Sequence, residues 1–136
     1  MIQVIFGKKG SGKTKRILDM ANASVKEAKG NVLFIDDDKS YTLSLKPQIR
    51  FIDASEYAVK GKAPFYGFLA GILAGNYDIT DMYVDATLKI GGKDLEGLAK
   101  MIDKLNKLTK DSEVELVFTV SCDPSELPES LKGYIA

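Results

Sequence analysis

The stretch Gly7-Lys8-Lys9-Gly10-Ser11-Gly12-Lys13-Thr14 matches the pattern G-x-x-x-x-G-K-[ST] at every fixed position. A short apolar run at residues 2–6 precedes it. Apolar residues then recur with a period near 3.6 over residues 14–29, before Gly30. We therefore expect a buried strand, a tight glycine-rich loop and an amphipathic helix, in that order. This unit decides the fold, because a strand, loop and helix joined in this way begin a parallel α/β sheet.

The residues of this loop are suited to binding phosphate groups. Glycines allow positive φ angles, so successive N–H groups can converge on an anion, and the positive end of the helix dipole adds to the attraction. We expect Lys13 to reach the β- and γ-phosphates of a nucleotide and the Thr14 hydroxyl to bind Mg²⁺. The expected nucleotide-binding residues are Gly7, Lys8, Lys9, Gly10, Ser11, Gly12, Lys13, Thr14 and Lys15. A turn that binds nothing would not need a lysine and a hydroxyl at these positions.

Outside the loop, apolar runs of strand length alternate with segments of helical period. Strands are expected at residues 2–6, 31–36, 49–52, 79–85 and 114–120, and helices at 14–29, 55–59, 64–74 and 94–109. Residues 125–131 are expected to form at most a short helix, and residues 133–136 either a last short strand or a frayed tail. The alternation predicts an α/β fold, a three-layer αβα sandwich around a mostly parallel sheet of about five strands.

Composition and charge exclude several classes of protein. The 136 residues, 45% of them hydrophobic, predict a single domain over residues 1–136 with a buried core. The chain has no histidine and one cysteine, Cys122, which excludes Ser-His-Asp triads, histidine-ligated metals and internal disulfides. The 19 basic and 19 acidic side chains cancel, so no overall positive field favours nucleic acid.

The expected location of the protein is cytoplasmic. The first residues, Met-Ile-Gln-Val-Ile-Phe-Gly, contain no basic stretch and no cleavage site, so we expect no signal peptide. The longest apolar run, residues 63–75, is shorter than the roughly 18 residues typical of a membrane span, so we expect no such span.

Two acidic positions are candidates for the Mg²⁺ side of the site. Asp85 ends the apolar strand at residues 79–85, and Asp36 follows Val-Leu-Phe-Ile at the end of the second strand. Both are expected at the carboxyl edge of the sheet, where open α/β sheets bind ligands. Asp85 is the first candidate, and the acidic run 36–38 stays open as the alternative source of the main carboxylate.

On Gly7, Gly12, Lys13 and Thr14, the chain resembles the P-loop NTPase superfamily, well as far as Asp38 and beyond that only in the order of its elements. The resemblance implies that the loop is a Walker A motif. It also implies that Asp85 is the Walker B aspartate, which with Thr14 binds Mg²⁺.

Other positions resemble the additional-strand, RecA-like class of that superfamily. Thr119 and Ser121 resemble its polar sensor position, which would place their strand between the loop strand and the Asp85 strand. The class usually has a glutamate beside the Walker B aspartate, whereas Ala86 follows Asp85 here. That departure predicts slow hydrolysis, or a base from elsewhere.

Three functions remain open for a chain that binds ATP or another nucleoside triphosphate with Mg²⁺. The first is a slow ATPase or nucleotide-dependent switch acting on a partner, with Lys13 and Asp85 as catalytic residues. The second is a small-molecule or nucleotide kinase, in which Asp36 acts on the acceptor. The third is a binding module without turnover. A kinase needs a lid and an acceptor pocket, and residues 37–48 are short for both.

A protein partner or self-association is expected, and a nucleic-acid partner is not. Five positive charges between Lys8 and Arg16 are not continued by a basic stripe with interleaved aromatic residues. Gly67, Gly71 and Gly75 lie four residues apart and so share one helix face. This face either packs closely on the sheet or forms a groove for a dimer or partner.

Overall fold

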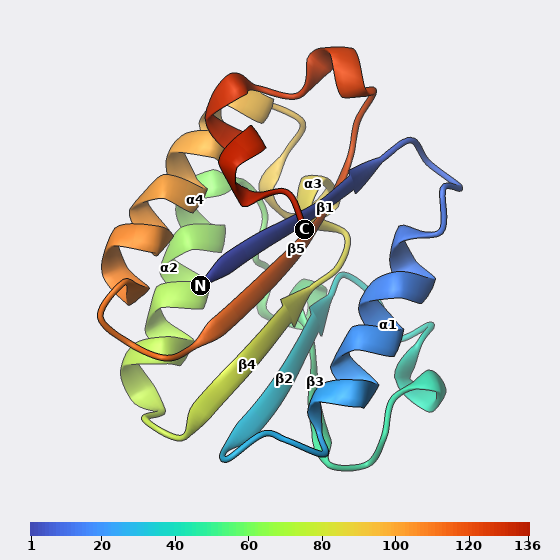
Figure 1. Cartoon of the computed structure of the whole chain (residues 1–136), viewed down its shortest axis with the longest axis vertical. Coiled ribbons are helices and arrows are strands. Elements are labelled where there is room, and N and C mark those ends of the chain that lie inside the picture. Colours follow the sequence, from blue (N-terminus) through green and yellow to red (C-terminus); the bar gives the residue numbers. More distant parts are fainter.

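The computed structural model describes residues 1–136 and contains a five-stranded, all-parallel sheet between layers of helices (Figure 1). The sheet order is β1-β5-β4-β2-β3. Its strands are β1 (Ile2–Gly7), β2 (Asn31–Asp36), β3 (Ile49–Asp53), β4 (Ile79–Val84) and β5 (Glu115–Ser121). The predicted three-layer αβα sandwich is therefore confirmed.

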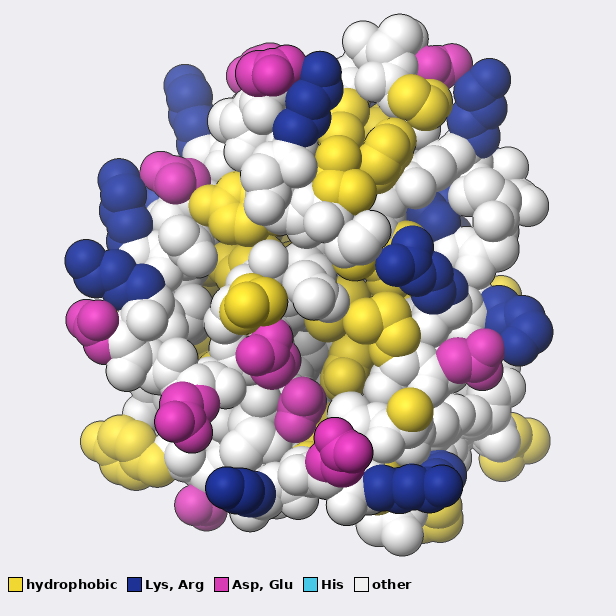
Figure 2. All heavy atoms as spheres, viewed as in Figure 1, with side chains coloured by type: hydrophobic (Ala, Val, Ile, Leu, Met, Phe, Trp, Pro, Cys, Tyr) yellow, Lys and Arg dark blue, Asp and Glu magenta, His cyan; other side chains and the backbone are white.

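Helices cover the two faces of the sheet unequally. One face carries only α1 (Lys13–Ser24), which forms with the sheet a cluster of nine buried apolar residues that include Ile5, Phe34 and Val117. The other face carries α2 (Lys62–Gly75), α3 (Thr87–Gly91) and α4 (Leu95–Thr109), which share with the sheet and the C-terminal turns a cluster of 21 buried residues. Apolar side chains consequently reach the surface alongside α1, as Figure 2 shows. The near-continuous apolar strands follow from this two-sided burial.

The first helix is shorter than predicted: α1 ends at Ser24 and not near Lys29. The Ser24 hydroxyl donates to the carbonyl of Ala21 at 2.8 Å, and Glu27 N–H donates to the carbonyl of Ser24 at 3.1 Å. Serine and the β-branched Val25 are weak helix formers, so the chain tightens into turns before β2.

Several short elements complete the chain. The expected helix near residues 55–59 is a 3₁₀ turn, η2 (Ala54–Tyr57), and η1 (Thr42–Ser44) precedes β3. Near the C-terminus, η3 (Pro124–Glu126) and η4 (Glu129–Tyr134) bury Leu127 and Leu131 in the larger core. Ile135 then forms a parallel bridge to Val4, so the last residues continue the sheet edge briefly.

The glycine stripe of α2 faces away from the sheet. A Cβ added at Gly67, Gly71 or Gly75 would meet no atom within 4 Å, whereas Phe65 and Leu69 are fully buried beneath the helix. The prediction that these glycines allow close packing on the sheet is therefore wrong, and a role in self-association stays a prediction. No helix has both the length and the apolar character to cross a membrane.

Candidate functional site

The loop at residues 7–12 connects the carboxyl end of β1 to the amino end of α1, as predicted. Gly10 and Gly12 have φ angles of 83° and 89°, a region that other residues rarely adopt. Gly7 is close to its own loop, since a Cβ there would lie 2.5 Å from Ser11 Oγ. The shape of the loop therefore requires glycine at positions 10 and 12, whereas Gly7 is restricted by its contact with the Ser11 side chain.

Lys13 is turned back onto this loop. Its ammonium donates to the carbonyl of Lys8 at 2.9 Å and lies 3.5 Å from Ser11 Oγ. Partial burial lowers the pKa of Lys13, and the negative charge of Asp85 opposes this shift. An anion in the loop would offer this ammonium a stronger acceptor than a neutral carbonyl.

Asp85 lies directly after β4 and is held by the two neighbouring strands. Its N–H donates to the carbonyl of Ile35 at 2.9 Å, and its carboxylate accepts a 2.5 Å hydrogen bond from Thr119 Oγ1. Both Asp85 and Thr119 are buried. Thr119 lies on β5, which runs between β1 and β4 as expected for the sensor position. Ser121, the other sensor candidate, is exposed and lines a pocket at the carboxyl end of the sheet.

Asp36 is a second buried carboxylate at the same edge of the sheet. It is 3% exposed and accepts a 2.8 Å hydrogen bond from Asp37 N–H. Burial raises the pKa of Asp36 to about 7, and the nearby charges of Asp85, Asp38 and Asp37 also raise it. One oxygen from each of Asp36, Asp37 and Asp38 lies within 4.8 Å of the others, so this run could contribute cation ligands.

A pocket of about 910 Å³ at the carboxyl end of the sheet brings most of the predicted site residues together. From the loop and the start of α1, Lys9, Gly10, Gly12, Lys13, Thr14 and Lys15 line it. Asp36, at the end of β2, and Asp85, directly after β4, also line it.

Three predicted loop residues do not line this pocket, namely Gly7, Lys8 and Ser11. Lys8 instead forms a 3.4 Å ion pair with Asp123, beyond β5. Lys15, which does line the pocket, forms an ion pair with Asp19 at 2.8 Å along α1.

A second wall of the pocket was not predicted. Thr87, Leu88 and Lys89 of α3 line it, followed by Lys93. The signal in the sequence was weak, because a five-residue helix is too short to show a period. The one local clue was the Gly91-Gly92 pair that ends it, where Gly92 has a φ angle of 90°.

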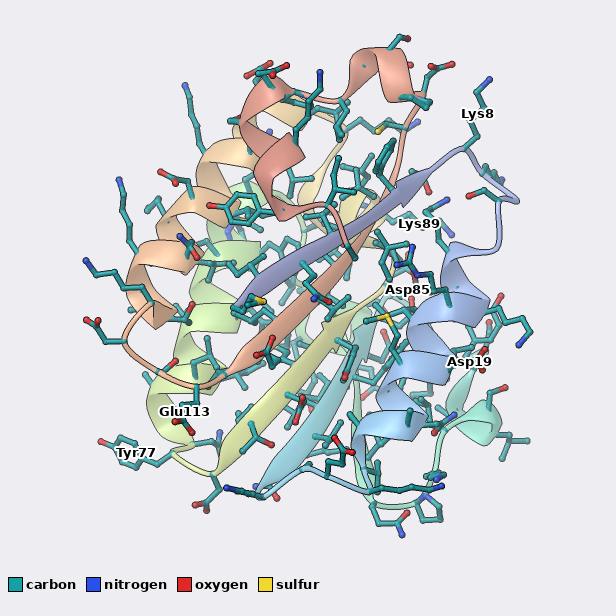
Figure 3. All side chains as sticks on the ribbon, viewed as in Figure 1. Lys8, Asp19, Tyr77, Asp85, Lys89 and Glu113 are labelled. Atoms are coloured by element: carbon teal, nitrogen blue, oxygen red, sulfur yellow. The ribbon has the colours of Figure 1, made fainter.

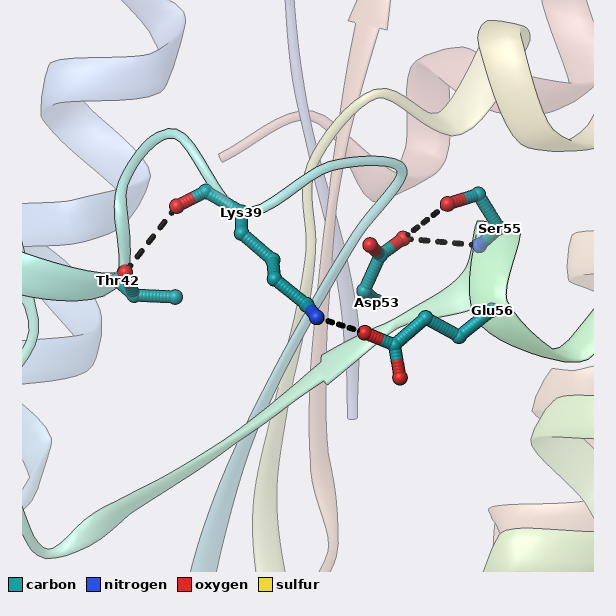
Figure 4. Close-up of polar contacts among 5 residues, drawn as sticks. All are labelled: Lys39, Thr42, Asp53, Ser55 and Glu56. Carbon is teal, nitrogen blue, oxygen red and sulfur yellow. Dashed lines mark hydrogen bonds and ion pairs between the residues drawn. The ribbon is translucent and has the colours of Figure 1, made fainter.

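Four residues of the segment 37–41 line the pocket, all but Lys39. Contacts of Lys39 hold this segment next to η2, which follows the edge strand β3 (Figure 4). Lys39 forms an ion pair with Glu56 of η2, and this hydrogen bond raises the pKa of Lys39. Thr42 Oγ1 donates to the carbonyl of Lys39 at 3.1 Å. Asp53 accepts hydrogen bonds from Ser55 N–H and Oγ at 2.9 and 2.6 Å, which fixes the start of η2.

The geometry offers a set of groups suited to a polyanion and a divalent cation. Residues of the loop, with their backbone N–H groups and the Lys13 ammonium, line the pocket together with residues that carry hydroxyl and carboxylate oxygens. No protein-family model matches the chain, and a search of curated proteins finds no match. The assignment of a function therefore depends on the residues of the pocket.

Proposed function

We propose that this protein binds a nucleoside triphosphate, ATP in the first instance, together with Mg²⁺. It would use residues 7–14 as a Walker A loop of the P-loop NTPase type. The observation that carries the proposal is the single pocket lined by Lys13, Thr14 and Asp85, with Thr119 hydrogen-bonded to Asp85. These groups come from α1, from the end of β4 and from β5, the strand that lies between β1 and β4 in the sheet.

Each residue has a defined task in this proposal. Lys13 would leave the carbonyl of Lys8 and bind the β- and γ-phosphates, while the loop N–H groups bind oxygens along the phosphate chain. The Thr14 hydroxyl and the Asp85 carboxylate would hold Mg²⁺, which supplies charge neutralisation at the phosphates. Thr119 would position Asp85 through their hydrogen bond.

Slow hydrolysis, with the nucleotide acting as a switch on a partner, is the favoured activity. The residue after Asp85 is Ala86, so no adjacent carboxylate is available to orient a water molecule. Backbone dipoles, Lys13 and Mg²⁺ would then supply most of the stabilisation of the phosphoryl group.

A kinase is the second candidate, because Asp36 is a buried carboxylate that lines the same pocket. Its raised pKa of about 7 suits a general base near neutral pH. Ser40 and Tyr41, from the segment that follows Asp36, line the same pocket.

The proposal is tested by measuring the affinity of the protein for ATP and GTP by calorimetry, with and without Mg²⁺. We expect Mg²⁺-dependent binding by the wild type and a loss of at least about tenfold in Lys13→Ala, the effect of one charge-assisted contact. Lys100→Ala is the matched control, because Lys100 is an exposed lysine on α4, outside the pocket. Absence of binding by the wild type would overturn the proposal.

Two further measurements separate the functions. Asp85→Ala should lose the Mg²⁺ dependence of binding, and full retention would refute the role of Asp85. Phosphate release without an acceptor supports the ATPase, whereas turnover only with an added acceptor supports the kinase. Binding without either supports the third alternative, a non-hydrolysing module.

A further inference from the structure

Helix α3 is a rigid wall of the pocket, although it is only one turn and a half long. It begins after Ala86, which has a φ angle of 57°, and ends at Gly92. Thr87, Ile90 and Gly91 are buried. The carbonyl of Ile90 also accepts a 2.8 Å hydrogen bond from Gly61 N–H. The helix is therefore held at its C-terminal end by a hydrogen bond and from beneath by its buried side chains.

This arrangement leaves Lys89 facing the pocket. With positions 87, 90 and 91 turned inward, the helical period directs positions 88 and 89 outward. Lys89 is exposed and lines the pocket that Lys13 and Thr14 also line. In the view of Figure 3, Lys89 and Asp85 are both at the carboxyl end of the sheet.

Besides Lys13, three lysines line the pocket without an ion pair, namely Lys9, Lys89 and Lys93, and of these Lys89 is the one on α3, the helix that follows Asp85. Lys15 is paired with Asp19, and Lys13 donates within its own loop. Lys89 forms no ion pair within 4 Å, and no arginine lines the pocket. The hydrogen bond from Ser40 N–H lowers the pKa of Asp38, and the positive charge of Lys89 adds to this shift. Lys89 therefore lies near the acidic run at residues 36–38, where an incoming phosphate chain would add further negative charge.

We propose that Lys89 is a second phosphate-binding lysine, which contacts the terminal phosphate of the bound triphosphate from the α3 wall, across the pocket from Lys13. The inference rests on the proposed function. If residues 7–14 hold the phosphates nearer the nucleoside, the terminal phosphate is the one that extends toward Asp85 and α3. A diphosphate would leave Lys89 without a contact. Lys89 therefore makes the site distinguish a nucleoside triphosphate from its diphosphate.

The experiment compares the affinities for ATP and ADP in the presence of Mg²⁺ for the wild type, Lys89→Ala, Lys89→Arg and Lys100→Ala. Lys89→Ala should weaken ATP binding by about tenfold and change ADP binding by less than about twofold, because only the terminal phosphate loses a charge-assisted hydrogen bond. Lys89→Arg should keep most of the ATP preference. Lys100→Ala should match the wild type.

Each other outcome overturns the inference. Equal losses for ATP and ADP in Lys89→Ala would mean that Lys89 acts on the site in general, and a thermal melt of the variant would reveal any loss of folding. Unchanged ATP binding would mean that Lys89 makes no contact. Failure of the wild type to bind either nucleotide would overturn the proposed function itself. That result differs from one in which the wild type binds and the substitution of Lys89 leaves the ratio of ATP to ADP affinity unchanged, which overturns only the role of Lys89.

Discussion

Replacing Asp36 with asparagine should make the protein more stable at neutral pH. Asp36 is almost fully buried beside two further carboxylates of the same run, and its pKa rises to about 7 from the ordinary 3.8. Between these two pH values the unfolded chain loses this proton while the folded protein keeps it. The contribution of this carboxyl group to the free energy of unfolding is therefore complete only below pH 3.8, the pKa in the unfolded chain. It is lost as the pH rises through about 7, the pKa in the folded protein.

The size of the effect follows from the gap between the two pKa values. A gap of about 3 corresponds to about 4 kcal/mol, at about 1.4 kcal/mol for each pKa unit. Since Asp36 lines an open pocket, water screens part of its charge, and we expect about half of that value, ~2 kcal/mol. The asparagine side chain introduced by Asp36→Asn would keep the acceptor for Asp37 N–H and could not ionise.

The assay is urea unfolding of the wild type and Asp36→Asn at several pH values from about 3.5 to 8, in buffer with a chelator to remove divalent cations. The two proteins should have similar stability at the acid end and differ by ~2 kcal/mol at pH 8, with the variant more stable. Asp111→Asn, an exposed carboxylate far along the chain, is the control and should follow the wild type. Parallel pH profiles for the wild type and Asp36→Asn would refute the argument from burial.

Three further substitutions test the supports of the pocket by the same unfolding assay. Thr119→Val removes the 2.5 Å hydrogen bond to buried Asp85 and should lower the free energy of unfolding by about 1–3 kcal/mol. Thr119→Ser keeps the hydroxyl and should lower it much less, and equal losses in the two variants would show that the hydrogen bond is unimportant. Gly91→Ala places a Cβ 2.8 Å from the buried ring of Phe65 and should cost about 1–3 kcal/mol, and a neutral result would mean that the ring moves freely. Ala86→Gly relieves a left-handed conformation and should stabilise by about 1 kcal/mol; a loss of stability would contradict the assignment of strain to this residue.

The fold was predictable because its signals are local and repeated. The eight residues 7–14 specify a strand, a loop and a helix by their spacing, and the observed φ angles of Gly10 and Gly12 agree with it. The apolar runs ending at Asp36 and Asp85 predicted two carboxylates at one sheet edge, where both line the pocket. The position of Thr119 between the loop strand and the Asp85 strand also followed from the expected strand order, which the sheet confirms.

The remaining features depend on contacts between distant parts of the chain. Helix α3 is stabilised by the hydrogen bond from Gly61 N–H to the carbonyl of Ile90 and by its buried residues. Its five residues are too few to show a helical period in the sequence. The glycine stripe of α2 was placed on the wrong side because this helix is apolar all round. The bulky residues Phe65 and Leu69 take the buried side, which leaves the glycines outside.

The pairing of the first strand with the last sets a condition on how the protein is made. Ile2 of β1 is in register with Leu116 of β5, and apart from the single bridge to Ile135, β1 has no other neighbour in the sheet. During synthesis, the loop at residues 7–14 leaves the ribosome early, but the strand that supports it is among the last segments to be translated. Pairing of β1 with β5 closes a loop of more than 100 residues, and folding that depends on such non-local parallel pairing is slow. A nascent chain that stops before β5 would therefore carry the complete loop sequence without the sheet that gives the loop its shape.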